Sequence, residues 1–267
     1  MKTVYCCYPG GKHKALTMSY DDGCVQDRRL VELFNRYGIK GTFHLNSGLT
    51  DRDGRIPPEE IPVLYRGHEI ACHTVTHPTL ARCPLSETAA ELLEDRKALE
   101  KLAGYPVRGL SYPNGSVTRE IETLLPSLGI RYSRIVGSTG DFTLPENPYR
   151  WEPTCHHSQR LMELGRQFLE LNKKQYLYLM YVWGHSYEFD RDNTWDLIED
   201  FCRMTGGKED IWYCTNIEWM DCMDDFSHLQ FAADNSFVFN PGIRDCWISV
   251  DGSPVRIPGG ETVRLDG

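Results

Sequence analysis

The sequence lacks the features that mark membrane proteins, exported proteins and nucleic-acid-binding proteins. No apolar run is long enough to span a membrane, and the N-terminal stretch holds no continuous apolar core of a signal peptide. Basic side chains form no block, and 29 of them against 38 acidic ones give a net charge of -9. These absences predict a cytoplasmic protein that binds neither a membrane nor a nucleic-acid backbone.

Cysteine pairs of the C-x-x-C type are also absent. The chain has ten cysteines, but they are scattered along its length. A scattered set gives no support to a structural zinc site held by cysteines. It favours free thiols in a reducing compartment.

What the sequence does contain is a repeated alternation of strand and helix patterns. Residues 14–20 have the alternation of a strand, and the apolar residues from Leu30 to Tyr37 recur at helical spacing before Gly38, a predicted helix end. Further strands are predicted at residues 39–45, 68–72, 107–112, 129–133, 176–183 and 211–215, and further helices at residues 59–66, 87–103, 118–125, 158–171 and 194–204. Repeats of strand, helix and strand imply a parallel sheet in an α/β fold.

Two stretches depart from this alternation. Residues 137–153 are rich in glycine and proline and contain Trp151, so they form a candidate substrate loop. After His228 the pattern changes to short alternating pieces separated by turn sequences. The sequence therefore predicts a barrel domain over residues 1–228 and a small antiparallel β appendage over residues 229–267.

Acidic and histidine side chains follow two of the predicted strands. Asp21 and Asp22 end the first strand, and His73 and His77 follow a later one. Alone, an Asp-Asp-Gly sequence is also common in turns, and a histidine pair also occurs as ordinary surface or core residues. Together, at strand ends that a parallel barrel brings to one edge, two histidines and one carboxylate can hold a divalent metal. The second carboxylate is then free to act as a base.

These residues also resemble the ordered motifs of a known family. Three motifs are Ser19-Tyr20-Asp21-Asp22-Gly23, His73-Thr74-Val75-Thr76-His77 and Tyr112-Pro113-Asn114-Gly115. Together with His185 at a strand end, they resemble the motifs of the polysaccharide deacetylase family, also known as the NodB-homology or carbohydrate esterase 4 group. The resemblance covers roughly residues 14–215 and implies a distorted (β/α)7-type barrel. It also implies that Asp21 is the catalytic base, that Asp22, His73 and His77 bind the metal, and that His185 protonates the leaving group.

The chain departs from the family at the third motif. Ser111 stands where family members usually carry an arginine that holds the catalytic aspartate. We expect Arg134, rather than Arg108 or Arg131, to supply the missing guanidinium, because it follows a strand directly. The family's Asp-Trp fourth motif is also unclear here, and Trp151 is the candidate for its aromatic wall. Tyr112, Trp151 and Arg134 are therefore the predicted substrate-binding residues.

Other polar residues lie near the predicted site. His44 is expected to be a structural or pocket-lining residue rather than a fourth ligand, and Glu188 or Asp190 could set the protonation of His185. His156 and His157 are adjacent in an extended segment, where neighbouring side chains point to opposite faces, so at most one should face the metal.

The resemblance implies a hydrolase that removes N-acetyl or O-acetyl groups from an acetylated carbohydrate. Zinc is the default metal, and cobalt, nickel or iron also suit two histidines and a carboxylate. Two alternatives stay open: an amidase of the same fold acting on a small amide, and a carbohydrate-binding protein that has lost turnover. Assembly into a homo-oligomer is also left open.

Overall fold

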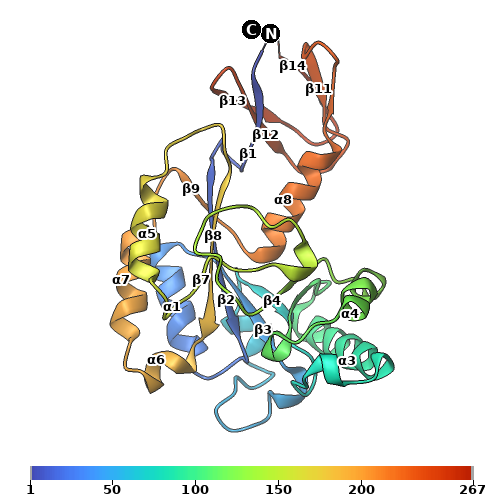
Figure 1. The fold of residues 1–267 in the computed structure, drawn as a ribbon, viewed down its shortest axis with the longest axis vertical. Coiled ribbons are helices and arrows are strands. Elements are labelled where there is room, and N and C mark those ends of the chain that lie inside the picture. The colour runs from blue at the N-terminus through green and yellow to red at the C-terminus, as the bar shows by residue number, and fades with distance from the viewer. Residues whose placement is uncertain (1, 266–267) are drawn as a thin grey trace.

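A curled parallel sheet forms the centre of the molecule (Figure 1). The computed structural model describes residues 2–265, and the strand order is β6-β5-β4-β3-β2-β8-β7, with β9 also paired to β2. These strands are β2 (Lys14–Asp21), β3 (Gly41–Leu45), β4 (Glu69–Cys72), β5 (Gly109–Ser111), β6 (Tyr132–Arg134), β7 (Cys155–His156), β8 (Tyr178–His185) and β9 (Ile211–Tyr213). The predicted distorted parallel barrel is confirmed.

Strand β2 is the central strand, and all eight of its residues are buried. It pairs in parallel with β3 along one edge and with β8 along the other, so both of its edges are hydrogen-bonded. In this register Asp21 lies beside His44 of β3 and His185 of β8. The carboxyl ends of these strands therefore meet at one edge, where α/β barrels place their chemistry.

The predicted substrate loop is instead part of the barrel wall. Trp151 forms a parallel bridge to Arg134, and its N–H donates to the Ser133 carbonyl at 3.0 Å. Strand β7 follows at once and pairs with β8. The segment therefore lies between β6 and β8 in the barrel wall. Its hydrogen bonds there give its backbone polar groups partners.

Eight α-helices accompany the strands among residues 2–265. They are α1 (Asp27–Tyr37), α2 (Ile61–Leu64), α3 (Leu85–Ala103), α4 (Arg119–Leu124), α5 (Leu161–Glu170), α6 (Tyr187–Arg191), α7 (Trp195–Thr205) and α8 (Asn216–His228). In α1, Leu30, Leu33 and Phe34 form the buried stripe, and Gly38 ends the helix with a φ of 67°, a conformation that favours glycine.

Helices α6 and α8 are not among the predicted elements. Helix α8 begins with a capping box, in which the Thr215 hydroxyl accepts from the Glu218 N–H and the Glu218 carboxylate accepts from the Thr215 N–H. Asn216, the first residue of α8, is fully buried: its side chain contacts Thr17 and Tyr181 inside the barrel. Helix α8 thus connects the barrel interior to the C-terminal strands.

The C-terminal strands are antiparallel, as predicted, and they belong to two small sheets. One contains β10 (Gln230–Phe231), β11 (Phe237–Phe239) and β14 (Thr262–Arg264), and the other contains β1 (Val4–Cys7), β12 (Cys246–Val250) and β13 (Ser253–Ile257). Because β1 pairs with β12, both ends of the chain contribute to this β unit, and a barrel domain that includes residues 4–7 does not match the pairing.

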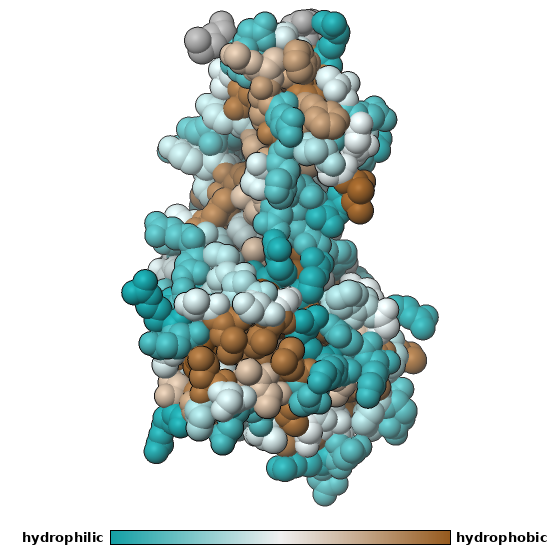
Figure 2. Space-filling model, turned by 90° about the vertical axis from the view of Figure 1, so that its right-hand side faces the viewer, coloured by the Kyte–Doolittle hydropathy of each residue, from teal (hydrophilic) through white to brown (hydrophobic). Residues whose placement is uncertain are grey.

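The β unit lies at the amino ends of the barrel strands, at the top of Figure 1. In Figure 2 it is the narrow upper part of the molecule above the wider barrel, and exposed hydrophobic surface gathers mainly on the barrel part of that face. Among the described residues, no helix combines the length and the apolar character needed to cross a bilayer.

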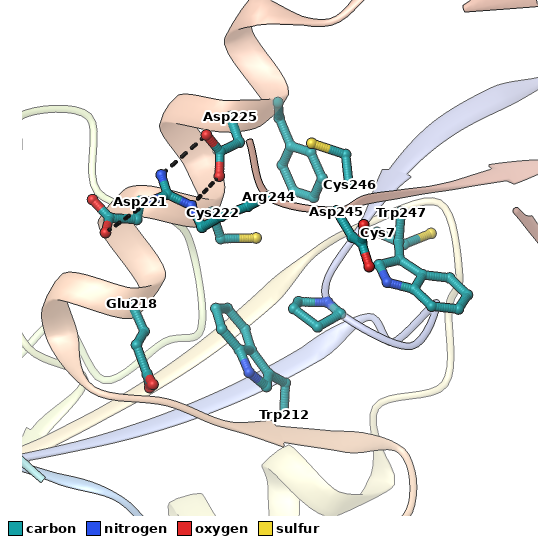
Figure 3. A pocket seen from close by; sticks show the side chains of 12 residues that line it. Cys7, Trp212, Glu218, Asp221, Cys222, Asp225, Arg244, Asp245, Cys246 and Trp247 are labelled. Atoms are coloured by element: carbon teal, nitrogen blue, oxygen red, sulfur yellow. Dashed lines mark hydrogen bonds and ion pairs between the residues drawn. The ribbon is translucent and has the colours of Figure 1, made fainter. Parts of the chain in front are cut away.

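A surface pocket lies between α8 and the β unit (Figure 3). Trp212 and Trp247 line it, and its acidic side chains are paired: Arg244 contacts Asp225 at 2.6 Å and Asp221 at 3.4 Å. Trp212 lies on β9, which pairs with the first residues of β2, whereas Asp21 is the last residue of β2, so the pocket is not part of the site described next.

Candidate metal and catalytic centre

Three predicted metal ligands converge at the carboxyl ends of β2 and β4. The Asp22 Oδ1 atom lies 3.7 Å from His73 Nε2 and 3.8 Å from His77 Nε2. Ligand atoms that surround a tetrahedral zinc ion at about 2.0–2.1 Å lie about 3.3 Å from one another. The three donor atoms are therefore spaced to close around one ion with little movement.

The donor atoms also have the environment of metal ligands. Asp22 Oδ1 is buried and accepts no hydrogen bond from the described residues. A buried carboxylate oxygen without a partner is costly, and a cation is the partner that these two imidazoles would share with it. The residues therefore fit a divalent metal.

Backbone strain is concentrated at the same place. Asp22, Thr74 and His77 have φ values of 81°, 69° and 61°. Non-glycine residues rarely adopt this left-handed region, and for β-branched Thr74 it is a clear outlier. Strain of this kind persists where surrounding structure enforces it and tends to mark functional sites. Here it orients two of the three candidate ligands.

His73 is held in the orientation that a metal ligand needs. Its Nδ1 lies 2.8 Å from the Ser111 carbonyl oxygen, and its backbone N–H donates to the buried Asp95 at 3.0 Å. A proton on Nδ1 that is donated to a carbonyl leaves the Nε2 lone pair free, facing Asp22.

Asp21 is almost completely buried beside this group, with 2% of its surface exposed. The Arg134 guanidinium donates to its Oδ2 atom, Ser111 Oγ donates to Oδ1 at 3.1 Å, and His44 Nδ1 lies 3.3 Å from Oδ1. Burial on its own would raise the pKa of the Asp21 carboxyl, but Arg134 and the neighbouring histidines outweigh burial and hold that pKa well below its usual range.

The arginine that contacts Asp21 is the one favoured from the sequence. Arg108 pairs with Asp221 and Arg131 pairs with Asp224, and both partners lie on α8. Only Arg134 of the three reaches the Asp21 carboxylate among the described contacts. Arg134 also lies over the Trp183 ring, with the guanidinium carbon 4.2 Å from the ring centre.

The three predicted substrate-binding residues do not face a cleft, which corrects the expectation. Tyr112, Trp151 and Arg134 are each 1% exposed. The Trp151 ring packs against Tyr181 and Trp219 because its segment closes the barrel, and the Tyr112 hydroxyl donates to a backbone carbonyl. These side chains support the walls of the site rather than offering it a surface.

His185 is placed at the end of β8, next to Asp21 in the sheet register. Its Nδ1 atom lies 3.5 Å from Glu188 Oε2, and its backbone N–H donates to the same oxygen at 3.2 Å. Burial lowers the pKa of His185, but Glu188, Asp21 and Asp22 together raise it above its ordinary value. Glu188 is thus the residue that sets its charge, whereas Asp190 contacts Gln26 and Trp195.

His156 and His157 differ from the expectation that they point to opposite faces. Their rings lie 4.4 Å apart, and both face Glu188 rather than the Asp22 group. Strand β7 ends at His156, so strict alternation stops there. Only the placement of α6, which carries Glu188, reveals this cluster, and no local sequence signal could have shown it.

The match to a family of known proteins covers the first half of the barrel. Residues 8–133 match the family model described as polysaccharide deacetylase. This range contains the first three motifs, including Asp21, Asp22, His73 and His77.

Curated relatives match over a similar stretch. A peptidoglycan-N-acetylglucosamine deacetylase from Bacillus cereus is 26% identical over 113 residues, which are 41% of this chain and 40% of that protein. A chitooligosaccharide deacetylase from Bradyrhizobium sp. is 26% identical over 114 residues, 40% of this chain and 49% of that protein. The chain spans less than half of the length of these two relatives.

Solved structures share the fold over most of the chain. A candidate polysaccharide deacetylase from Mycobacterium smegmatis has a TM-score of 0.62 at 18% identity, over 82% of this chain and 93% of that one. A mutant of BA3943, a CE4 family pseudoenzyme with restored enzymatic activity, has a TM-score of 0.54 at 15% identity. The match covers 81% of this chain and 70% of that one. The predicted resemblance of this chain to the polysaccharide deacetylase family is therefore confirmed.

Proposed function

We propose that this protein is a metal-dependent hydrolase that removes acetyl groups from an acetylated carbohydrate. The observation that carries the proposal is the convergence of Asp22, His73 and His77 on one point beside a separate carboxylate, Asp21. Three ligands together with an adjacent base form the donor set of a hydrolytic metal site with an open position.

Asp22, His73 and His77 would hold the metal, for which zinc is the default and cobalt, nickel or iron also fit. When bound, it supplies a Lewis acid that activates water and polarises an acetyl carbonyl. The chain's own groups then position the reactants and move the protons.

Asp21 is the proposed base. It accepts a proton from the water whose oxygen attacks the acetyl carbon, and its carboxylate is held in place by Arg134, Ser111 and His44. A base fixed by three partners loses little entropy when the reaction begins. Arg134 thus replaces, from the neighbouring strand β6, the arginine that the third motif lacks.

His185 is the proposed acid. It lies beside Asp21 in the sheet register and donates a proton to the leaving nitrogen, or oxygen for an ester, as the bond to the acetyl carbon breaks. The products are acetate and a free amine or alcohol. Glu188 orients the His185 ring through its contact with Nδ1, so that the Nε2 side is available to the substrate.

The proposed substrate follows from the relatives. The curated proteins that match this chain are named for deacetylation of peptidoglycan or of chitooligosaccharide, and both substrates carry N-acetylated amino sugars. An N-acetylated hexosamine is therefore the first substrate to test.

The two alternative functions have less support. A non-catalytic binding protein was suggested by the missing third-motif arginine, but Arg134 makes the corresponding contact to Asp21. No contact of the described residues favours a small-amide substrate over a carbohydrate.

The test is acetate release from N-acetylglucosamine oligomers by metal-free and zinc-reconstituted protein. We expect release only after reconstitution, its loss in Asp22→Asn, and full release in Asp196→Asn, which changes an exposed aspartate on α7. Release by Asp22→Asn at the wild-type rate, or no release by folded, zinc-loaded wild-type protein, would contradict the proposal.

A further inference from the structure

A second group of possible metal ligands lies beside the proposed catalytic centre. His156 Nε2 is 3.0 Å and His157 Nε2 is 3.4 Å from the same atom, Glu188 Oε2. All three donor atoms lie within 4.8 Å of one another, as do those of the Asp22 group. The two groups share no residue.

The position of His157 is fixed by close packing. Its ring stacks on Phe189 at 4.3 Å and on Tyr20 at 5.8 Å, and its backbone N–H donates to the Trp183 carbonyl at 2.8 Å. A Cβ atom on Gly184 would lie 2.0 Å from His157 Nδ1, so the ring occupies space that only a glycine leaves open. The ring is thus held with Nε2 toward Glu188.

Either neutral form of the His157 ring leaves Nδ1 without a hydrogen-bond partner among the described residues, while Nε2 faces the Glu188 carboxylate. A proton on Nε2 can be donated to Glu188 and leaves only the Nδ1 lone pair without a donor, whereas a proton on Nδ1 leaves the Nε2 lone pair against a carboxylate oxygen. When Nδ1 carries the proton, a cation between His157 Nε2 and Glu188 Oε2 would replace the repulsion between the lone pair and the carboxylate with two ligand bonds.

His156 can adopt the matching form. Its Nδ1 lies 2.8 Å from Ser158 Oγ, which can accept a proton from it and so leave the Nε2 lone pair free toward Glu188. The other tautomer, with Nε2–H donating to Glu188, is the arrangement expected if no ion binds. The two tautomers predict different zinc stoichiometries.

We propose that His156, His157 and Glu188 form a second binding site for a divalent transition-metal ion, separate from the Asp22–His73–His77 site. Two imidazoles and one carboxylate suit zinc and similar borderline cations. The ion would share Glu188 Oε2 with His185, whose Nδ1 lies 3.5 Å from that atom. Occupancy would therefore weaken the contact between Glu188 and His185.

The test counts bound zinc. Wild-type protein is stripped with a chelator, dialysed against a series of free Zn²⁺ concentrations, and analysed for bound metal. The same is done for His156→Ala and Glu188→Gln at the second site, for Asp22→Asn at the first, and for His228→Ala, an exposed histidine at the end of α8. Circular dichroism and thermal melting identify folded variants; Glu188→Gln, which keeps the side-chain volume, serves if His156→Ala does not fold.

We expect two saturable equivalents in the wild type and in His228→Ala, and one in His156→Ala, Glu188→Gln and Asp22→Asn. A single equivalent that is lost in His156→Ala but kept in Asp22→Asn would support the second site and contradict the proposed catalytic one. The second site would be overturned if the wild-type protein bound no zinc. It would also be overturned if the protein bound one or two equivalents of zinc and neither His156→Ala nor Glu188→Gln reduced that number.

Discussion

Replacing Arg134 with methionine removes the cation that neutralises the buried Asp21. The two side chains are 1% and 3% exposed, and their contact is the only described Lys or Arg ion pair of Asp21. Methionine fills much of the same volume but leaves the carboxylate with Ser111, His44 and the more distant His73. Breaking a buried ion pair from one side costs about 3–5 kcal/mol, because the remaining charge stays desolvated.

Arg131→Met is the matched control. Arg131 pairs with Asp224, but the two side chains are 46% and 35% exposed. Solvent screens such a pair, and its loss should cost about 1 kcal/mol or less. A difference of about 2–5 kcal/mol between the two variants is therefore expected. Asp21→Asn combined with Arg134→Met should cost less than the two single losses added together, because no uncompensated charge remains.

The assay is urea unfolding of metal-free protein near pH 7, followed by tryptophan fluorescence and circular dichroism, with the slope compared between variants. The pKa of Asp21 is held below its ordinary value of 3.8 in the folded protein. The stability that Arg134 adds is therefore present above pH 3.8, and it is lost as the pH falls through the pKa that Asp21 has in the folded protein. The cost of Arg134→Met should therefore shrink on acidification. Equal costs for Arg134→Met and Arg131→Met would refute the placement of Arg134 on a buried, charged Asp21.

Three further outcomes follow from single contacts. Ser111→Ala removes the hydroxyl that contacts both Asp21 and His73, while the Ser111 carbonyl contact to His73 remains. Zinc affinity, measured by chelator competition, should therefore fall about 10-fold. Unchanged zinc affinity would exclude a role for the hydroxyl. Burial raises the pKa of Glu69 to about 7 from 4.5, so the folded state holds this proton more tightly and the free energy of unfolding falls as the pH rises from about 4.5 to 7. Glu69→Gln should reduce this decrease in the free energy of unfolding by up to about 3 kcal/mol, measured by urea titrations at pH 5 and pH 8. The same decrease in the wild type and in Glu69→Gln would contradict a buried, protonated Glu69. Gly184→Ala places a Cβ atom 2.0 Å from His157 Nδ1, and it should lower the free energy of unfolding by about 1–3 kcal/mol; a neutral effect would show that the ring is not fixed there.

The sequence predicted the elements whose signals are local. Strand β2 and helix α1 were found because their apolar periods are regular and Gly38 ends the helix. Helix α3 begins at Leu85, two residues before the predicted start at residue 87, because the Pro84 carbonyl accepts the first hydrogen bonds of the helix.

Other elements depend on distant partners. Strand β7 has two residues and exists only because β8 lies beside it, and β1 is a strand because it pairs with β12 near the other end of the chain. Helix α8 mixes acidic and apolar residues and is positioned by its capping box and by Asn216 inside the barrel. The strand partners and the contacts of Asn216 cannot be read from a short window of sequence, whereas the Thr215–Glu218 capping box is a local signal that the prediction missed.

The candidate site divides in the same way. Asp21, Asp22, His73 and His77 were found because strand ends in a parallel barrel meet, and the fold brings them together. The substrate role of Trp151 was predicted from a loop composition that did not reveal barrel closure, so its burial could not be foreseen.

The most direct test of the central claim is to measure bound zinc and acetate release on the same preparations of wild-type protein and Asp21→Asn. If Asp21 is the base and Asp22 a ligand, the variant keeps its zinc and loses about 10²–10⁴-fold in the rate of acetate release from N-acetylglucosamine oligomers. Equal rates at equal zinc content would contradict the account, because Asp21 would then have no part in the proton transfer.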